Sequence, residues 1–395
     1  MSADQLLGSI STRVNAIEET GIVDVAMYGW GREDLVPFWF GEGDVSTPQF
    51  ICDAACEALR AGDTFYTDQR GITSLRETIR DYMNRSFGTD LDIDRLTVTN
   101  SGMAALALLN QVLLNDGDEV IVIGPVWPNI FSAIRANGGV PVDASIRLTS
   151  EGWKLDLEEI FSAAGPKTKA IFINSPSNPT GWMMEADEQR AVMDFARERG
   201  IWVIADEVYH QLVFDRPVAP SFLNCSQPDD RLVVVNSFSK SWLMTGWRIG
   251  WITHPTGIGS TLAKMVQITT SGVPPFLQHA AMVAMRDGDH VIKDLRERCL
   301  KGRDLVYDRL EAWPRVRAVR PKGAFYAFFG VEGMDNSVDY AKQIIDECNV
   351  GLAPGNAFGA SGEGYLRLCY ASEPATLERG MDRLEKMLGS GSRQD

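Results

Sequence analysis

Residues 170–181 read AIFINSPSNPTG, and this stretch decides the fold class of the chain. Its first four residues form a short apolar run, which is typical of a strand buried on both faces. The polar residues from Asn174 to Gly181 begin where that strand ends. A second apolar run, residues 201–204, likewise precedes the polar stretch Ala205 to Tyr209. Since ligands bind at the carboxyl ends of strands in open α/β sheets, we expect both polar stretches at a binding edge.

Apolar strands and amphipathic helices alternate on both sides of this stretch. The expected elements are strand 119–123, helix 128–137, strand 170–173, helix 186–199, strand 201–205 and strand 231–236. This alternation predicts an α/β fold with a mostly parallel sheet flanked by helices. A long charged helix from Val291 to Leu310 begins a different unit, which contains a strand at 365–369 and a final helix. A chain of 395 residues, 45% of them hydrophobic, suits a large domain plus a smaller one.

A lysine and an arginine downstream suggest the chemistry of this edge. Lys240 ends the run SFSK, and Arg248 ends the run TGWR. A buried lysine loses its proton readily and can form a Schiff base with an aldehyde, whereas guanidinium stays charged and can hold a phosphate. A cofactor that carries both an aldehyde and a phosphate would use both residues.

These motifs resemble, in order and spacing, the class I/II aminotransferases, which are fold type I pyridoxal phosphate enzymes similar to aspartate aminotransferase. The resemblance runs from about residue 36 to residue 385. It implies a large cofactor-binding domain at 48–290 and a smaller α+β domain made of 1–47 and 291–395. The active site would lie in the cleft between them, and we expect a disordered tail at 389–395.

By this resemblance, three residues act in catalysis on pyridoxal 5′-phosphate. Lys240 forms the Schiff base and then moves a proton from the substrate. Asp206 lies against the pyridine nitrogen and makes the ring a better electron sink. Tyr209, together with Asn178, binds the phenolic oxygen of the ring. Asn178 also suits a turn, so both of its roles can hold together.

The resemblance also assigns the remaining cofactor contacts. Trp127 stacks on the ring, although core packing would explain it equally. The phosphate contacts are Ser101, Gly102, Met103, Ser237, Ser239 and Arg248. Gly102 and Met103 would offer backbone N–H groups at the N-terminus of a helix expected from Ala104 to Leu114. Tyr66 matches a tyrosine that reaches the phosphate of a partner chain, which implies a homodimer with shared active sites; an interface or core aromatic is the alternative.

Arg367 matches the arginine that binds the α-carboxylate of the substrate, with Asn178 and the backbone of Gly41 assisting. The family more often has proline where this chain has Gly43. The implied reaction moves an amino group from an L-amino acid to a 2-oxo acid by ping-pong kinetics.

Fewer residues of the sequence indicate which substrate the chain prefers. One dicarboxylate-specific branch of the family has a lysine where this chain has Met103, which favours a neutral or aromatic amino acid here. Arg32 and Arg70 are the other basic residues expected near the entrance. We also predict that Tyr28 and Trp30 line the substrate pocket.

Two rival functions remain open on the sequence. A pyridoxal phosphate-dependent carbon–sulfur β-lyase, or a synthase of the same superfamily, would keep Lys240, Asp206, Tyr209 and Arg367. A non-catalytic cofactor-binding protein, such as the sensor half of a transcription regulator, would need an appended DNA-binding domain.

Composition excludes other classes of partner. A net charge of −15 argues against nucleic acid and anionic membranes. The four histidines and six cysteines lack ligand-like spacing, so no metal site is expected. The first residues do not look like a signal peptide and no apolar stretch is long enough to span a bilayer, so we expect a cytoplasmic protein.

Overall fold

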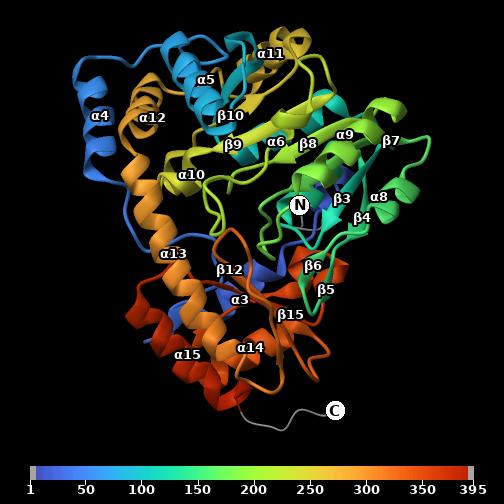
Figure 1. The fold of residues 1–395 in the computed structure, drawn as a ribbon, viewed down its shortest axis with the longest axis vertical. Helices are drawn as coiled ribbons and strands as arrows, with labels where there is room; N and C mark the ends of the chain where they lie inside the picture. Colours follow the sequence, from blue (N-terminus) through green and yellow to red (C-terminus); the bar gives the residue numbers. More distant parts are fainter. Residues whose placement is uncertain (1–5, 390–395) are drawn as a thin grey trace.

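A seven-stranded sheet forms the centre of the larger part of the molecule. The computed structural model describes residues 6–389, and Figure 1 shows this sheet above a second, smaller one. Its strands, in spatial order, are β2 (Leu96–Thr99), β10 (Gly250–Thr253), β9 (Leu232–Ser237), β8 (Trp202–Asp206), β7 (Thr168–Asn174), β3 (Glu119–Gly124) and β4 (Val140–Ser145). Strand β10 is antiparallel to both of its neighbours, and the other strands run parallel.

The central strands are buried on both faces, as the apolar runs predict. Along β7, Ile171 and Ile173 belong to one hydrophobic cluster while Ala170 and Phe172 belong to another. Successive side chains of a strand point to opposite faces, so each face needs its own cover of helices. One face packs against α4 (Gln49–Arg60), α5 (Thr73–Phe87), α8 (Leu157–Ala163), α9 (Ala186–Arg199) and α12 (Pro275–Asp287), and the other against α6 (Gly102–Leu113), α7 (Asn129–Ala136) and α11 (Gly259–Thr269).

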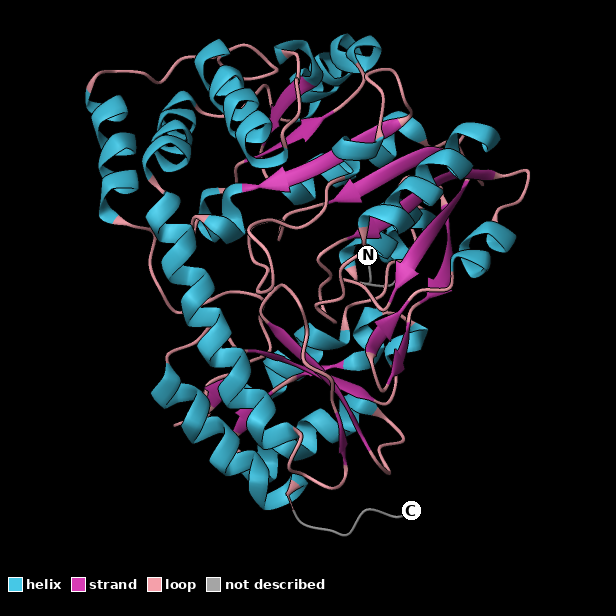
Figure 2. Ribbon diagram, in the orientation of Figure 1, coloured by secondary structure: helices cyan, strands magenta, loops and turns pink. Residues whose placement is uncertain are grey.

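The smaller sheet is antiparallel and has its own core. Its strands are β11 (Val316–Arg317), β12 (Tyr326–Val331), β15 (Tyr365–Cys369) and β14 (Ala353–Pro354). Its helices are α13 (Asp289–Leu310), α14 (Ser337–Cys348) and α15 (Pro374–Leu388). Figure 2 shows α13 running from the larger part down along the smaller one.

The N-terminal segment packs with this C-terminal unit. Helix α3 (Gly21–Gly29) contacts α14, and β1 (Val36–Pro37) pairs in parallel with β13 (Val350–Gly351). Ile22, Val36 and Phe38 share a hydrophobic cluster with residues of β12 and β15. These contacts support a domain division at residues 48 and 290, which stays a proposal.

The predicted α/β fold is confirmed, and the expected strands and helices are present with ends shifted by one or two residues. The helix expected at 128–137 spans 129–136, and the strand expected at 170–173 spans 168–174. Of the predicted tail, Gly389 is the C-cap residue that follows α15, and residues 390–395 lie outside the described part of the chain.

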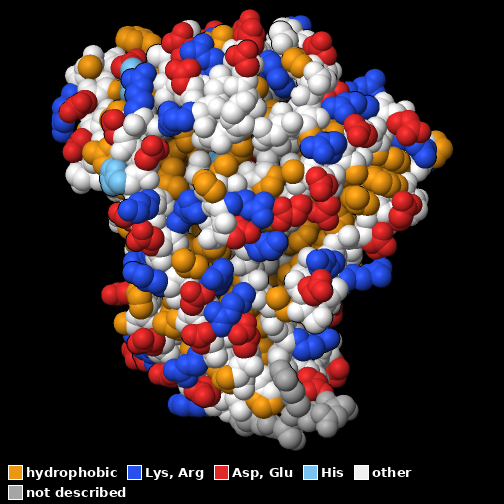
Figure 3. All heavy atoms as spheres, in the orientation of Figure 1, with side chains coloured by type: hydrophobic (Ala, Val, Ile, Leu, Met, Phe, Trp, Pro, Cys, Tyr) orange, Lys and Arg blue, Asp and Glu red, His pale blue; other side chains and the backbone are white. Residues whose placement is uncertain are grey.

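Two features of the structure concern nucleic acid and membranes as partners: the charge on the surface and the apolarity of the helices. Acidic and basic side chains are interspersed over the face drawn in Figure 3. None of the helices in residues 6–389 is both long and apolar enough to cross a bilayer.

Candidate active site

A cavity of about 440 Å³ brings the predicted site residues together. Its wall includes residues of both sheets and of the N-terminal segment. The predicted residues on this wall are Gly41, Gly102, Met103, Trp127, Asn178, Asp206, Tyr209, Ser237, Ser239, Lys240, Arg248 and Arg367. Ser101 and Tyr66, predicted to contact the phosphate, do not line it.

The strand ends of the larger sheet supply much of this wall. Asn174 is the last residue of β7, Asp206 of β8 and Ser237 of β9. These strands are parallel neighbours, so their carboxyl ends open onto the same edge. The cavity therefore lies where a doubly wound sheet places its ligands.

Lys240 lies in the short helix α10 (Phe238–Ser241), directly after β9. Its Nζ atom donates a hydrogen bond to the carbonyl oxygen of Gly41 at 2.6 Å. Burial lowers the pKa of the Lys240 ammonium to about 8, because water no longer stabilises its charge. A lysine with this pKa keeps a larger fraction of neutral amine near physiological pH than an exposed lysine does, and a nucleophile needs the neutral amine.

Asp206 is a buried acid on the cavity wall. Its Oδ1 atom accepts a hydrogen bond from the backbone N–H of Val208 at 3.3 Å, and burial raises the pKa of the carboxyl to about 7. Asn174 Nδ2 and the Ser175 N–H both donate to the Asp206 carbonyl oxygen at 3.1 Å. These bonds hold the end of the strand in place. The Asp206 carboxylate can still form an ion pair with a positively charged group of a ligand in the cavity.

Hydroxyl and backbone groups gather at the N-terminus of α6. The Ser101 hydroxyl caps this helix by accepting from the Ala104 N–H at 3.0 Å, which explains why it does not line the cavity. Ser237 Oγ donates to Ser239 Oγ at 2.9 Å. A side chain at Gly250 would meet the Gly102 nitrogen at 2.9 Å, so glycine lets β10 approach this helix end. The backbone N–H groups at the N-terminus of α6 can bind an anion.

Arg248 stands beside these groups. Its Nη1 atom is 3.5 Å from Ser239 Oγ and also donates to the Thr245 carbonyl oxygen. The backbone of Arg248 is left-handed, with φ at 54°. This turn returns the chain from α10 into β10 and leaves the guanidinium on the cavity wall.

Arg367 occupies a different part of the wall, in the middle of β15, and is 2% exposed. Nη1 donates to Asn178 Oδ1 at 2.9 Å, and Nη2 donates to the Trp39 carbonyl oxygen. The guanidinium lies over the rings of Tyr326 and Phe358, at 4.7 and 4.9 Å from their centroids. Its Nε atom is buried and has no hydrogen-bond partner among the described residues.

Three cations on this wall lack an acidic partner. Lys240, Arg248 and Arg367 bond to carbonyl, amide or hydroxyl oxygens, and none forms an ion pair with a carboxylate within residues 6–389. Arg367, which is 2% exposed, is a buried cation without a carboxylate partner, and such a charge is costly, so an anionic ligand would stabilise the site. These residues therefore fit an aldehyde cofactor with a phosphate, plus a substrate carboxylate.

The predictions for Tyr28 and Trp30 are wrong for the cavity of this chain. The Tyr28 hydroxyl donates to Asp346 at 2.9 Å, and Trp30 is 69% exposed. The N-terminal segment instead lines the cavity with Thr20, Ile22 and Val23, because the first turn of α3 faces the cavity and its later residues face α14.

Arg32 and Arg70, expected near the entrance, do not line the cavity. Arg32 pairs with Asp346 at 2.7 Å, and Arg70 donates to the carbonyl oxygens of Asp94 and Leu96. Tyr66 is 90% exposed and borders a separate hollow, lined by residues 64–67 and 270–276.

Sequence reasoning missed Tyr326, which lines the cavity at the start of β12. Its hydroxyl is 2.7 Å from the hydroxyl of Tyr209. No motif marks this tyrosine, and only the pairing of β12 with β15 brings it beside Arg367.

Comparison with known proteins agrees with this arrangement. Residues 37–384 match the family described as aminotransferase class I and II. The chain is 36% identical over 359 residues to the aspartate aminotransferase of Thermotoga maritima, covering 91% of this chain and 92% of the relative. It is 31% identical over 384 residues to the aromatic-amino-acid aminotransferase 2 of Thermococcus litoralis, covering 96% and 98%.

Solved structures show the same fold. An alanine aminotransferase from Pyrococcus furiosus superposes with a TM-score of 0.91 at 27% identity, covering 96% of this chain and 99% of the other. An aspartate aminotransferase from Thermus thermophilus with maleate gives 0.89 at 30% identity, with the same coverage.

Proposed function

Because this chain belongs to the aminotransferase class I and II family and is an aminotransferase, we propose that it binds pyridoxal 5′-phosphate, the cofactor that the family uses, through Lys240. The observation that carries the proposal is the set of three cations, Lys240, Arg248 and Arg367, that line one cavity without a carboxylate partner in the described residues. A phosphate and a substrate carboxylate would supply the two missing anions.

Each part of the cofactor would have its own set of residues. Asp206 would hold the pyridine nitrogen, Tyr209 and Asn178 the phenolic oxygen, and Trp127 the ring face. The phosphate would bind Ser101, Gly102, Met103, Ser237, Ser239 and Arg248, with Tyr66 from a second copy of the chain. The cofactor supplies an electron sink for the electrons left when the substrate loses its α-proton.

The residues of the chain would orient the substrate and move its proton. Arg367 would bind the α-carboxylate, and its contact with Asn178 would hold the guanidinium in place. Lys240 would act as the base, since burial keeps the pKa of its amine near 8. Asp206, as a carboxylate, would stabilise a proton on the ring nitrogen. The amino acid would leave as a 2-oxo acid, and a second 2-oxo acid would take up the amino group.

The lining of the cavity supports a neutral or aromatic amino acid. Lys240, Arg248 and Arg367 are the basic side chains that line it among the described residues, and each already has a role. Met103 stands where one dicarboxylate-specific branch has lysine, and Ile22, Val23 and Phe40 add apolar surface. The names of the relatives include aspartate, alanine and aromatic amino acids. The proposal of a neutral or aromatic substrate therefore rests on the residues of the cavity wall.

We also propose a cytoplasmic homodimer with shared active sites. Phe65, Tyr66 and Ile268 are 75% or more exposed, which is unusual for large apolar side chains and suits an interface. The β-lyase, synthase and non-catalytic alternatives gain no support from the relatives named above, each of which is an aminotransferase.

A visible absorption spectrum tests the proposal. The protein with added pyridoxal phosphate should show a band that borohydride fixes covalently, and peptide mapping should place the modification on Lys240. One amino acid from a panel should remove the band without any 2-oxo acid, and a 2-oxo acid should restore it. Pyruvate and ammonia accumulating while the band persists would support the lyase instead, and modification of another lysine would refute the assignment of Lys240.

A further inference from the structure

The hydroxyls of Tyr326 and Tyr209 form a hydrogen bond that joins the two sheets. The two oxygens are 2.7 Å apart, and both side chains are buried. Tyr326 begins β12 of the smaller sheet, whereas Tyr209 follows β8 of the larger one. Each hydroxyl has the other as its hydrogen-bond partner within residues 6–389.

The position of Tyr326 is constrained on several sides. A Cβ atom at Gly41 would overlap its hydroxyl, so the loop at Gly41 closes one side. The Arg367 guanidinium covers the ring face at 4.7 Å. Its ring therefore cannot turn away from Tyr209 without moving one of these neighbours.

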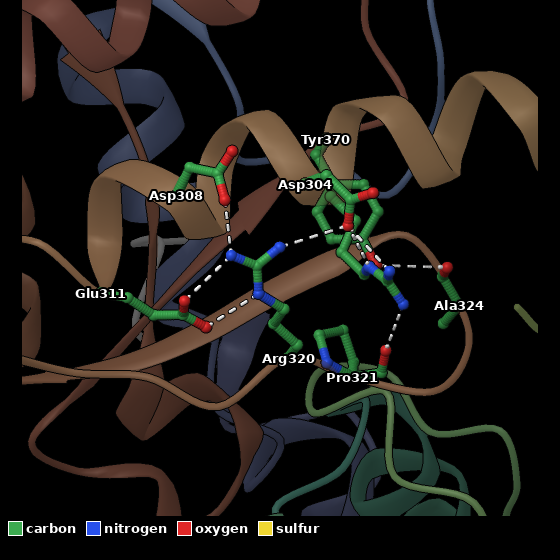
Figure 4. Close-up of polar contacts among 8 residues, drawn as sticks. Asp304, Asp308, Glu311, Arg320, Pro321, Ala324 and Tyr370 are labelled. Atoms are coloured by element: carbon green, nitrogen blue, oxygen red, sulfur yellow. Dashed lines mark hydrogen bonds and ion pairs between the residues drawn. The ribbon is translucent and has the colours of Figure 1, made fainter. Parts of the chain in front are cut away.

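The segment leading into Tyr326 is anchored to α13, as Figure 4 shows. Arg320 bonds to Asp308 at 2.6 Å and to Glu311 at 2.9 Å. Four residues later, the Ala324 carbonyl oxygen accepts from the Tyr370 hydroxyl at 3.5 Å. This network fixes the backbone from which Tyr326 projects.

Each of the two tyrosine hydroxyls has a single proton, and this decides which of them donates the hydrogen bond between them. A phenol has one proton to donate and can accept at its oxygen. If Tyr209 donates to the phenolic oxygen of the cofactor, its own oxygen must accept from Tyr326. A donor that also accepts a hydrogen bond is polarised and donates more strongly.

We propose that Tyr326 is a positioning residue that acts through Tyr209: it directs the Tyr209 proton toward the cofactor and strengthens that hydrogen bond. This inference rests on the proposed function. Because the strengthened bond stabilises the anionic phenolic oxygen, it lowers the pH at which the bound cofactor loses its proton.

Other charged and titratable groups surround the pair and would respond to a disturbed site. Arg367 and Cys369 on β15 and Asp206 on β8 act on the pair, and Nζ of Lys240 in α10 lies 5.9 Å from the centroid of the Tyr209 ring. Lys240 in turn interacts with Arg248 and with Glu42 of the N-terminal segment. A test must therefore distinguish the hydroxyl bond from a general change in this environment.

The experiment is a pH titration of the visible absorption band of the cofactor-loaded enzyme without substrate. We expect Tyr326→Phe to raise the midpoint by about 0.3 to 0.7 pH units and Tyr209→Phe to raise it further. In the Tyr209→Phe background, Tyr326→Phe should cause no further shift, because its effect passes through Tyr209. The phenylalanine keeps the ring under Arg367, so the KM of the amino acid should change less than about twofold.

Tyr365→Phe is the matched control. Its ring stacks on Phe328 at 5.0 Å in the same sheet, and it does not line the cavity. The pH midpoint of the absorption band in Tyr365→Phe should equal that of the wild type.

Two results would overturn the inference: an unchanged midpoint in Tyr326→Phe, or a shift of equal size in the Tyr209→Phe background. The second result would mean that Tyr326 acts independently of Tyr209. If the wild type forms no visible band with the cofactor, the proposed function fails instead, so the two failures are distinguishable.

Discussion

The Oδ1 atom of Asn178 lies 2.9 Å from Nη1 of Arg367, although the two residues are 189 positions apart in the chain. Asn178 follows β7 of the larger sheet, and Arg367 lies within β15 of the smaller one. The main chain of Trp39 holds the other nitrogen of the fork. Three distant segments thus fix the guanidinium that faces the cavity.

Replacement of Arg367 by lysine should weaken substrate binding and leave the cofactor in place. Lysine keeps the charge but lacks the planar guanidinium. It cannot donate hydrogen bonds to Asn178, Trp39 and a substrate carboxylate at the same time. We expect kcat/KM for the amino acid to fall about 100-fold, or about 3 kcal/mol. Steady-state kinetics and the cofactor absorption band would check this. Arg317→Lys, on the exposed side of β11, is the control and should behave as the wild type; equal losses in both variants would contradict the prediction.

Attachment of the cofactor should depend on pH through Lys240. Burial lowers the pKa of this amine to about 8 from its ordinary 10.5, so the ammonium predominates below pH 8 and cannot attack an aldehyde. The attachment rate should therefore rise up to about pH 8 and level off above it. Stopped-flow absorbance of cofactor-free enzyme mixed with pyridoxal phosphate measures this rate. A rate that keeps rising to about pH 10, as for an unperturbed lysine, would show that the amine is not perturbed.

Gly41→Ala should disturb the site from the side of the N-terminal segment. The added methyl group would overlap the Tyr326 hydroxyl, and either that ring or the loop must move. We expect kcat to fall by about tenfold or more, because small displacements near reacting groups are costly. Gly257→Ala is the control, since a Cβ there meets nothing within 4 Å. Full activity in Gly41→Ala would mean that the loop yields freely.

Mixing two inactive variants should restore activity if two chains build each site. Lys240→Ala lacks the attachment lysine, and Tyr66→Ala lacks the residue that we propose crosses to the partner. A mixed dimer has one site with both residues intact, so random mixing after unfolding and refolding should give about a quarter of wild-type activity. Activity no higher than the weighted mean of the two variants would argue against sharing.

Met103→Lys should move the preference toward dicarboxylic amino acids. The residue lines the cavity, so a lysine there would add a cation to an otherwise apolar stretch. We expect kcat/KM for aspartate relative to phenylalanine to rise by about tenfold or more. Met103→Leu keeps the volume without the charge and should leave the ratio unchanged. If both variants shift it equally, shape rather than charge sets the preference.

Much of the fold could be predicted from local sequence, because each strand carries its own signal. The run 170–173 is apolar throughout, and it forms a strand whose alternate residues enter two separate cores. Asp206 ends such a strand and Lys240 lies in the short helix that follows another, so their place at the sheet edge is a local consequence of the sequence. Tyr326 and the packing of α3 had no such signal, which is why Tyr326 was missed and Tyr28 and Trp30 were misplaced.

The sequence by itself determined the fold class, the family and the residues at the carboxyl ends of the parallel strands, because hydrophobic periodicity and short motifs act over a few neighbouring positions. Only the tertiary structure decided which residues of the smaller sheet and the N-terminal segment face that edge. The contacts of Tyr326 with Tyr209 and of Arg367 with Asn178 join residues 117 and 189 positions apart. Such pairs form only when elements of the larger and the smaller sheet pack together, and no local pattern encodes their relative placement.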